Sequence, residues 1–537
     1  MDRSRLLVES LIHAAEAHHV RGADDVASLI ARVAATVARR RNTGAYAIES
    51  LETLLLSMSR RLSHSSEGFV NTQVGTGRLR PTVLHIMTGA FAAGGHTRLV
   101  TRWIEFHEAA RSSLVITEPA NPEPPGQLAE AVSAAGGRIL RLGGTIADRA
   151  LALRSLAHDA DTLVLSIHED DIVPSLALAA AAWRPPTVVV NHADHVFWVG
   201  ASVADVVASL RPSGQELATR RRGIMANRSM QMPIPIRSFP RRASRERARV
   251  AIGLHGDHRL LLTVGQAYKF APVNGRHLIE ALGPILEAPD VRLVAIGPTE
   301  NDEPWVAARN RYGDRVQAIG MRPDIDPFMD AADVYLDSYP IPSITAALDA
   351  GALGLPVVSL SPDGEWWPDV AVEDDPALVD HVLIDVARYR ERVGELVRSA
   401  STRAAAGRSI QLRIDEVHGS QAWLRSLDRV LDAARDAASM RSTSVWRPAG
   451  KPGLQDVLLA EFIAAHDKRP DLRFTPEEGF HGRRTQMAAV NQKLTRIDSL
   501  ILESASPAEA AYRDAIRTAR SLSPARLRLR TGRWSRS

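Results

Sequence analysis

The sequence contains no cysteine in 537 residues. Disulfide bonds and thiolate metal sites are therefore excluded, and any catalysis must rely on other side chains. It also lacks a run of roughly 18 apolar residues, the minimum for a membrane-spanning helix. Charged residues interrupt positions 1–30, where a secretory signal would need an apolar core. We therefore expect a cytoplasmic protein, either free or attached peripherally to the inner face of the membrane.

Hydrophobic residues make up 45% of the chain, which is enough for more than one folded domain. In residues 1–80, leucine and isoleucine recur at helical spacing and a polar stretch follows, so we predict a helical segment that ends in a linker. This segment should cap the next domain or form an oligomer contact. The rest of the chain is predicted to divide into a first α/β domain at 81–225, a linker at 226–250, a second α/β domain at 251–440 and a helical extension at 441–537.

The first α/β domain opens on an apolar strand at 83–87, a glycine-containing turn at 88–95 and a helix led by His96. Such a turn lets backbone amides approach a phosphate or a sugar closely, although this one matches neither a Walker A motif nor the dinucleotide fingerprint. Further strands alternate with helical stretches, which is typical of a parallel sheet covered on both faces. These strands are predicted at 113–117, 138–142, 162–167, 187–190 and 205–210, the last being the final strand of the domain.

Two of these strands end in dense polar clusters, 168–171 and 191–195, at the sheet edge where α/β proteins place ligands. A metal site at His192, Asp194 and His195 is one interpretation, but the spacing matches no zinc motif and we predict no metal. A second interpretation is structural, with Asp194 capping a helix and the histidines bonded to nearby backbone. The third makes Asp194 or a histidine the base that deprotonates a substrate. The candidate catalytic residues are then His96, His192, Asp194 and His195.

The second α/β domain repeats the alternation of buried strands and helices. Its strands end in glycine, proline or small polar residues, as strands of a doubly wound sheet do where they meet a ligand. The predicted fold class is therefore α/β, with two doubly wound Rossmann-like domains between a helical N-terminal segment and a helical C-terminal extension. The strands of the second sheet are predicted at 260–264, 291–296, 316–319, 334–336 and 357–360.

The stretch 333–360 combines the signals of a ligand site at one sheet edge. An apolar strand ends, two prolines keep the following residues extended, and a helix then starts. Ser343 can cap this helix, whose free amide groups suit an anion. Asp349 falls one turn into the helix, on the face that Thr345 begins. Because this polar cluster with one carboxylate suits a phosphate and a ribose diol, we predict a nucleotide-sugar site.

Together these features resemble the GT-B class of nucleotide-sugar glycosyltransferases over about residues 81–435. The segments QAYKFAP at 266–272 and LDSYP at 336–340, with the GLPVV that follows the helix, are most similar to the branch that holds the O-GlcNAc transferases and related bacterial protein glycosyltransferases.

The resemblance implies that Lys269 meets the donor diphosphate with Gln266 beside it. It also implies that Thr345 bonds phosphate oxygens and that Asp349 takes the ribose hydroxyls. Backbone groups at 320–322 could read the nucleotide base, or this loop could be only a connection. The predicted donor-binding set is Gln266, Lys269, Gly320, Arg322, Ser343, Thr345 and Asp349.

The chain also departs from that pattern. Ile344 stands where the O-GlcNAc transferases have a histidine, so one phosphate contact is missing or replaced. Ile341 stands where retaining GT-B enzymes carry a second acid, which favours inversion by single displacement. Residues 1–80 show no tandem helical repeat. The acceptor is therefore not implied by the resemblance and could be a protein, a glycan or a lipid-linked molecule.

We predict a metal-independent glycosyltransferase that needs no cofactor and uses a UDP-sugar as its donor substrate. Two alternatives stay open. A sugar-nucleotide epimerase of the same fold would isomerise the UDP-sugar without any acceptor, and a non-catalytic binding protein would show no donor turnover. The C-terminal end is rich in arginine and lacks acidic residues after Asp514, which is typical of a solvated tail. Contact with an anionic surface is the alternative for this tail, and we expect no specific nucleic-acid partner.

Overall fold

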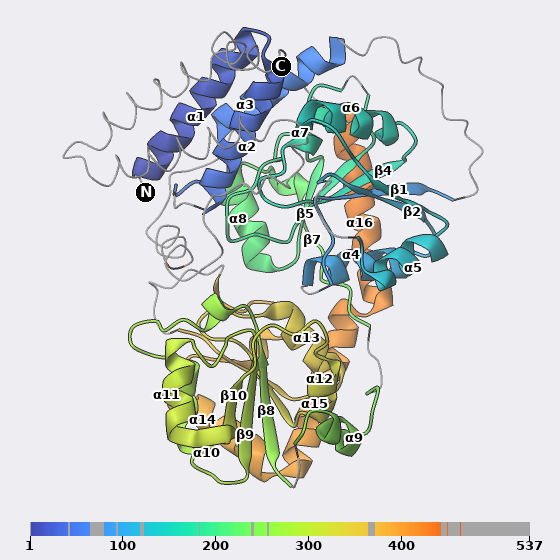
Figure 1. Cartoon of the computed structure of the whole chain (residues 1–537). Helices are drawn as coiled ribbons and strands as arrows, with labels where there is room; N and C mark the ends of the chain where they lie inside the picture. The colour runs from blue at the N-terminus through green and yellow to red at the C-terminus, as the bar shows by residue number, and fades with distance from the viewer. Residues whose placement is uncertain are drawn as a thin grey trace, which may run out of the picture.

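The computed structural model shows two α/β lobes one above the other, with a helical segment on the first (Figure 1). Within the described part of the chain, no helix combines the length and apolar character needed to cross a bilayer. The predictions for the linker at 65–79 and for most of the extension at 441–537 lie outside the described residues. The structure describes residues 2–40, 43–64, 80–92, 95–118, 123–181, 183–237, 241–254, 257–362 and 371–441, together with 448 and 462.

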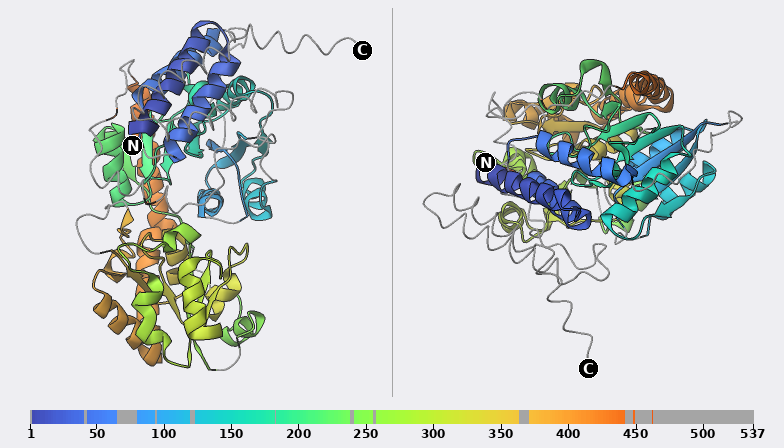
Figure 2. Two further views of the ribbon diagram at one scale, coloured as in Figure 1. Left: turned by 60° about the vertical axis from the view of Figure 1, so that its left-hand side comes forward. Right: turned by 90° about the horizontal axis from the view of Figure 1, so that it is seen from above.

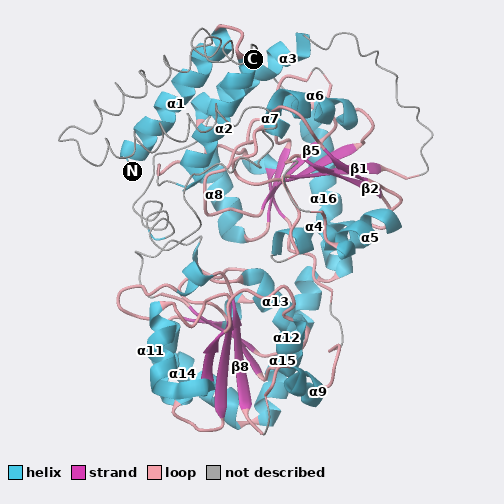
Figure 3. Cartoon of the chain, viewed as in Figure 1, coloured by secondary structure: helices cyan, strands magenta, loops and turns pink. Residues whose placement is uncertain are grey.

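The first lobe is built on a 7-stranded sheet in which every pairing is parallel. Its central strands are buried along their whole length, as their continuous valine and leucine runs predict for a sheet covered on both faces (Figure 3). From edge to edge the strands are β3 (Ile139–Arg141), β2 (Arg111–Ile116), β1 (Thr82–Met87), β4 (Thr162–Ser166), β5 (Thr187–Asn191), β6 (Val206–Ser209) and β7 (Ser229–Gln231).

The second lobe carries a 6-stranded parallel sheet of the same kind. In both sheets the strand order turns around at the first strand of the lobe, β1 or β8, which is the doubly wound arrangement predicted from the sequence. The predicted fold class is therefore confirmed. From edge to edge the strands are β10 (Val316–Ala318), β9 (Val291–Ile296), β8 (Arg259–Val264), β11 (Val334–Leu336), β12 (Val357–Leu360) and β13 (Val382–Leu383).

Helices cover both faces of each sheet (Figure 1). In the first lobe these are α4 (Gly95–Phe106), α5 (Gly126–Ala134), α6 (Ile146–Ala157), α7 (Val173–Leu178) and α8 (Pro212–Arg222). In and after the second lobe they are α9 (Arg245–Ala251), α10 (Leu278–Leu286), α11 (Glu303–Tyr312), α12 (Asp326–Ala331), α13 (Ile344–Ala352), α14 (Val386–Arg398), α15 (Ala400–His418) and α16 (Ser420–Ser439). Short 3-10 turns are η1 (Ala226–Arg228), η2 (Ala267–Phe270), η3 (Gly313–Arg315) and η5 (Val379–His381).

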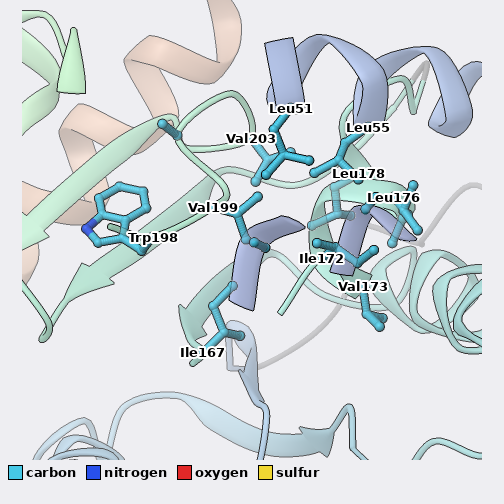
Figure 4. Close-up of a cluster of buried hydrophobic side chains, with 14 of the residues drawn as sticks. Leu51, Leu55, Ile167, Ile172, Val173, Leu176, Leu178, Trp198, Val199 and Val203 are labelled. Atoms are coloured by element: carbon cyan, nitrogen blue, oxygen red, sulfur yellow. The ribbon is translucent and has the colours of Figure 1, made fainter. Parts of the chain in front are cut away.

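The N-terminal segment forms three helices that pack on the first lobe, so the prediction of a helical cap is confirmed (Figure 2). Leu51 and Leu55 lie fully buried against α7 and the loop that follows β5 (Figure 4). Their apolar partners include Leu176 and Val203. The three helices therefore share one hydrophobic core with the first sheet. They are α1 (Asp2–Val20), α2 (Asp24–Arg40) and α3 (Glu49–His64).

The helix that follows the second lobe in the chain, α16, packs on the first lobe. α16 packs against β5 and β6, as Figure 2 shows for the orange helix that rises from one lobe along the other. Its Trp423 is fully buried and meets Trp103 and Phe106 of α4 edge to face, with ring centroids 5.4 and 5.6 Å apart. The resemblance to GT-B enzymes implies that the closing helices return to the first domain, and α16 does so as a covering helix of the first sheet.

Two short strands contradict the sequence predictions. β7 lies within the stretch predicted as a linker, so the prediction that the strand at 205–210 is the last of the first domain is wrong. The sequence pattern from Pro376 onward predicts helix, but β13 lies at residues 382–383, so that prediction is wrong for these two residues. Both are edge strands without an apolar run, because β7 reads Ser-Met-Gln and β13 has only two residues.

Replacing Trp423 by alanine should lower the free energy of unfolding by about 3 to 5 kcal/mol, because it removes a fully buried aromatic side chain at the centre of the α16 contact. Urea unfolding followed by tryptophan fluorescence and circular dichroism measures the change. The control is Leu412→Ala on α15, whose side chain is 67% exposed and should cost little. Equal effects of the two substitutions would contradict the role given to Trp423.

Candidate functional site

The loop between β11 and α13 is held in a tight turn by Asp337. One carboxylate oxygen of this buried residue accepts the backbone N–H groups of Ser338 and Ser343, each at 2.8 Å. Ser343 stands at the N-cap position of α13, as predicted, but its side chain does not cap the helix. Its hydroxyl bonds the Ser338 hydroxyl at 2.8 Å instead. The capping role predicted for the Ser343 side chain is therefore wrong, and the first amides of α13 keep no side-chain acceptor.

Gly265, at the end of β8, packs directly on this loop. A Cβ atom at this position would lie 2.6 Å from the Ser343 hydroxyl oxygen, closer than real contacts allow. Only glycine therefore fits between the loop after β8 and the loop after β11. This contact brings the segment that contains Lys269 up to the start of α13.

Lys269 lies on η2 and points at the entrance of α13. Its Nζ donates a hydrogen bond of 2.6 Å to the carbonyl oxygen of Pro342, two residues before the helix begins. Burial lowers the pKa of Lys269 to about 8, although the nearby carboxylate of Asp337 acts in the opposite direction. Lys269 therefore lies at the N-terminus of α13, and Asp349 lies one turn further along this helix, as the predicted donor site requires.

The composition of the chain also draws attention to Lys269, independently of the motif around it. The chain has 66 lysines and arginines, but only four are lysines, and Lys269 is the only lysine before Lys451. A protein that otherwise uses arginine at nearly every basic position keeps a lysine at this point. A compact ammonium group with three donors differs from the planar guanidinium in shape and hydration, so the choice is not neutral.

Helix α4 of the first lobe lies along α13 of the second. A Cβ atom on Gly95, the first residue of α4, would be 2.9 Å from the Thr345 hydroxyl oxygen. Further along both helices, Arg98 and Arg102 donate to the carboxylate of Asp349 at 2.6 and 2.7 Å. The contacts advance in the same direction on each helix, so the two helices are parallel here and their N-termini lie at the same end.

Three histidines gather beside the first-lobe end of this contact. The rings of His96 and His192 stack with centroids 4.2 Å apart, and His168 lies 5.9 Å from His96 in a tilted arrangement. Burial lowers the pKa of His96 and of His192, and the other histidines of the cluster lower that of His96 further. Both imidazoles are therefore neutral at pH 7, the form that a base requires, although the lowered pKa also makes each of them a weaker base. Their roles as bases stay predictions.

His192 also shows part of the structural alternative, because its Nδ1 lies 3.2 Å from the carbonyl oxygen of Val190. Neutral imidazole carries one N–H, and a carbonyl can only accept. Nδ1 is therefore the protonated nitrogen, and Nε2 is left as the acceptor on which a base would rely.

Asp194 is held as one half of an ion pair. Arg211, which follows β6, binds both of its oxygens at 2.7 and 3.2 Å, and His195 Nδ1 lies 3.3 Å from one of them. Burial alone would raise the pKa of Asp194, but Arg211 holds it well below its usual range. This arrangement disfavours Asp194 as the base. It also contradicts the alternative of a helix cap, because the next helix, α8, begins only at Pro212.

Sequence reasoning missed the function of Arg211. Its Nη1 donates to the carbonyl oxygen of Val372 in the second lobe at 2.8 Å, and the backbone N–H of Ser213 donates to Asp374 at 2.6 Å. We call these contacts the inter-lobe tether. The only sequence signal for it is an arginine at the carboxyl end of a strand, because its partners lie more than a hundred residues away.

The three carboxylates of the cluster at 168–171 are engaged in contacts within the protein. Arg39 of α2 pairs with Glu169 at 2.8 Å, and Thr36 of the same helix donates to Asp170 at 2.7 Å. Asp171 accepts from the Thr88 hydroxyl at 2.7 Å. Two of these three carboxylates therefore complete the contact between the N-terminal helices and the first sheet.

Glu52 of α3 ties the same helical segment to the loop after β5. Its carboxylate accepts the backbone N–H groups of Gly200 and Ala201 at 2.7 and 3.2 Å and also binds the hydroxyl of Ser202. The loop that starts at His192 is thus anchored at its far end by the N-terminal segment. The helical cap therefore supports the histidine cluster as well as the core.

The remaining predicted donor residues lie on neighbouring loops of the second sheet. Gln266 is exposed and directly precedes η2. Gly320 has a positive φ of 71° and its carbonyl oxygen accepts the N–H of Gly297 at 3.0 Å, so the loops after β9 and β10 are joined. Arg322 is exposed beyond them. These placements leave base recognition by 320–322 a prediction. In the described residues, no group of three His, Asp or Glu side chains has the arrangement of a metal site.

Comparison with known families gives a match over the second lobe. Residues 258–398, which span β8 to the end of α14, match the family described as glycosyl transferases group 1. The matched stretch includes Lys269, the α13 entrance and Asp349. A search of curated protein sequences gave no match.

Solved structures share the two-lobed architecture of this chain. HepE (Alr3699) from Anabaena, solved with UDP and glucose, is 15% identical with a TM-score of 0.50, over 65% of this chain and 99% of that one. A glycosyltransferase from Rickettsia africae is 8% identical with a TM-score of 0.49, over 67% and 100%. An O-GlcNAc transferase from Thermobaculum terrenum is 17% identical with a TM-score of 0.48, over 82% and 83%. The likeness to HepE shows that the two lobes form a GT-B fold.

Proposed function

We propose that this protein transfers a sugar from a UDP-sugar to an acceptor hydroxyl group, without a metal ion and with inversion at the anomeric carbon. The observation that carries the proposal is the meeting of two helix N-termini and one lysine. The first residue of α4 touches Thr345 in the first turn of α13, and Lys269 lies at the entrance of α13.

This arrangement brings positive charge from several sources to one point and suits an anion. Each helix N-terminus carries about half a positive charge and free N–H groups, and the α13 terminus has no side-chain cap among the described residues. The lysine adds a further charge beside them. A diphosphate would satisfy these amides and balance these charges, and both would stabilise the negative charge that develops on UDP as it leaves.

Asp349 suits the nucleoside end of the same ligand. It lies one turn along α13 from Thr345, on the same face of the helix. A carboxylate there can accept both hydroxyl groups of a ribose. The bound UDP in the Anabaena neighbour supports a uridine nucleotide for the shared fold.

The acceptor would approach from the first lobe, where His96 and His192 stack close to the α4 N-terminus. In the proposed step, the acceptor oxygen attacks the anomeric carbon and its proton passes to a neutral imidazole. The bond from that carbon to the diphosphate oxygen breaks, and UDP leaves with the electron pair. Since Ile341 stands where a second acid would be needed, a single displacement with inversion is the form we propose.

The test is incubation of the full chain with UDP-glucose, UDP-galactose and UDP-N-acetylglucosamine, followed by ¹H and ³¹P NMR. We expect UDP to appear with at least one donor even when water is the only acceptor, and the released sugar to have the opposite anomeric configuration at first. Interconversion of UDP-sugars without UDP release would establish the epimerase alternative. Stable donors throughout, with or without added glycan and peptide acceptors, would contradict the proposal.

A further inference from the structure

Asp349, the acid expected to hold the ribose, is already occupied in this structure. Arg98 Nη1 donates to one of its oxygens at 2.6 Å and Arg102 Nη2 donates to the other at 2.7 Å. The Asp349 side chain is only 13% exposed. Each oxygen of the carboxylate therefore already accepts a hydrogen bond from a cation.

Both cations come from the opposite lobe. Arg98 and Arg102 lie on α4 of the first lobe, 251 and 247 residues away from Asp349 in the chain. The side chain of Arg102 is 17% exposed and that of Arg98 is 34% exposed, so these pairs are partly shielded from water. Such charge-assisted bonds are stronger than neutral hydrogen bonds and less screened than surface pairs.

The same helix contact also closes the anion end of the site. The first turn of α4 sits directly against Thr345, because a Cβ atom at position 95 would lie 2.9 Å from the Thr345 hydroxyl oxygen. A nucleotide lying along α13 would need both the space beside Thr345 and the carboxylate of Asp349. Entry therefore requires α4 to move aside, and its N-terminus must return to Thr345 for both helices to hold the diphosphate.

We propose that Arg98 and Arg102 form a latch that competes with the nucleotide for Asp349 and occupies this carboxylate until a donor binds. This inference rests on the proposed function, because it takes Asp349 as the ribose ligand. The latch lowers the apparent affinity for the donor, since only the fraction of molecules with a free Asp349 can bind. Donor binding then displaces the two arginines from Asp349, while the N-terminus of α4 stays at the diphosphate.

The latch predicts the direction in which the affinity for the nucleotide changes when the arginines are removed. If the arginines bound the donor phosphates, their removal would weaken nucleotide binding. If they block Asp349, removal strengthens it. For the double variant Arg98→Gln and Arg102→Gln we expect the Kd for UDP to fall about 10-fold, within the range typical of coupling between two sites.

The experiment is isothermal titration of UDP into the full chain, with four proteins compared. The double glutamine variant should bind more tightly than the wild type, and Asp349→Ala should bind more weakly. Asp374→Ala is the matched control, because it loosens the inter-lobe tether at Ser213 without touching Asp349. Its affinity should stay within about 2-fold of the wild type. If the glutamine variant does not fold, Arg98→Lys with Arg102→Lys serves as a weaker latch and should show a smaller change in the same direction.

The outcomes separate the two proposals. Unchanged or weaker UDP binding by the double variant, with normal binding by the wild type, overturns the latch alone. Equal tightening by Asp374→Ala also overturns it, because the effect would then come from general loosening of the lobes. Unchanged binding by Asp349→Ala overturns the ribose role. No UDP binding by any of the proteins overturns the proposed function itself.

Discussion

Replacing Lys269 by alanine should lower the turnover of the UDP-sugar by about 100-fold to 1000-fold, the effect typical of removing one group that stabilises developing negative charge. The lysine lies at the entrance of α13, where its ammonium group would meet the diphosphate as UDP leaves. Because its ammonium group donates to a loop carbonyl, that of Pro342, and not to a residue of the core, the fold should survive the substitution.

The measurement is UDP release in a coupled assay, with thermal unfolding recorded in parallel. Arg247→Ala is a suitable control, since Arg247 is an exposed cation on α9 in the same lobe. Lys269→Arg keeps a positive charge but changes its shape, so it should recover only part of the activity. Turnover by Lys269→Ala within a few-fold of the wild type would remove Lys269 from the mechanism.

The free energy of unfolding should fall steeply as the pH drops from 6.5 toward 4. Burial lowers the pKa of His85 to about 3, helped by the nearby His107, and lowers that of His277 to about 4. In the unfolded chain both titrate near 6.5. Below pH 6.5 the unfolded state therefore binds protons that the folded state refuses, and acid favours unfolding. Above pH 6.5 the two histidines contribute no slope.

The expected loss is about 1.4 kcal/mol per pH unit for each histidine while the pH lies between its two pKa values. Urea unfolding at pH 7.5, 6.5, 5.5 and 4.5 measures it. His85→Phe should reduce the slope and keep the edge-to-face contact with Trp103. His277→Asn should reduce it as well and still cap α10, where the Nδ1 of His277 now accepts the N–H of Ile279.

The control for this prediction is His158, an exposed residue that stacks on the surface ring of Trp183. His158→Gln should leave the pH slope as it is in the wild type. An identical slope in the wild type and in the variant that lacks both His85 and His277 would contradict the prediction.

Local signals in the sequence predict most of the fold. Continuous valine and leucine runs give nearly all the parallel strands, because a strand buried on both faces carries its apolar character in every residue. Segments that follow those strands give the donor loops, since the carboxyl ends of parallel strands meet at one sheet edge. The sequence does not predict β7 because its three residues, Ser-Met-Gln, are mostly polar, or β13 because two residues carry no pattern.

The polar residues of the site form two groups, those whose place the sequence indicates and those whose partners it does not reveal. Lys269 and Asp349 could be found from the sequence because each lies at a fixed offset from a strand end or a helix start. Asp194 and the cluster at 168–171 looked equally catalytic, yet Arg211 and the N-terminal helices engage them. Their partners are distant in sequence, so no local pattern distinguishes a free carboxylate from a paired one.

The sequence by itself therefore determined the two parallel sheets, the entrance of α13 and the lysine beside it, because each depends on residues within a few positions of one another. Only the tertiary structure decided which charges face one another across the lobes. The pairing of Arg98 and Arg102 with Asp349 depends on how α4 and α13 are brought together, more than two hundred residues apart. The physical reason is that the interaction energy of an ion pair depends on the distance between its charges in space, and only the folded chain fixes that distance.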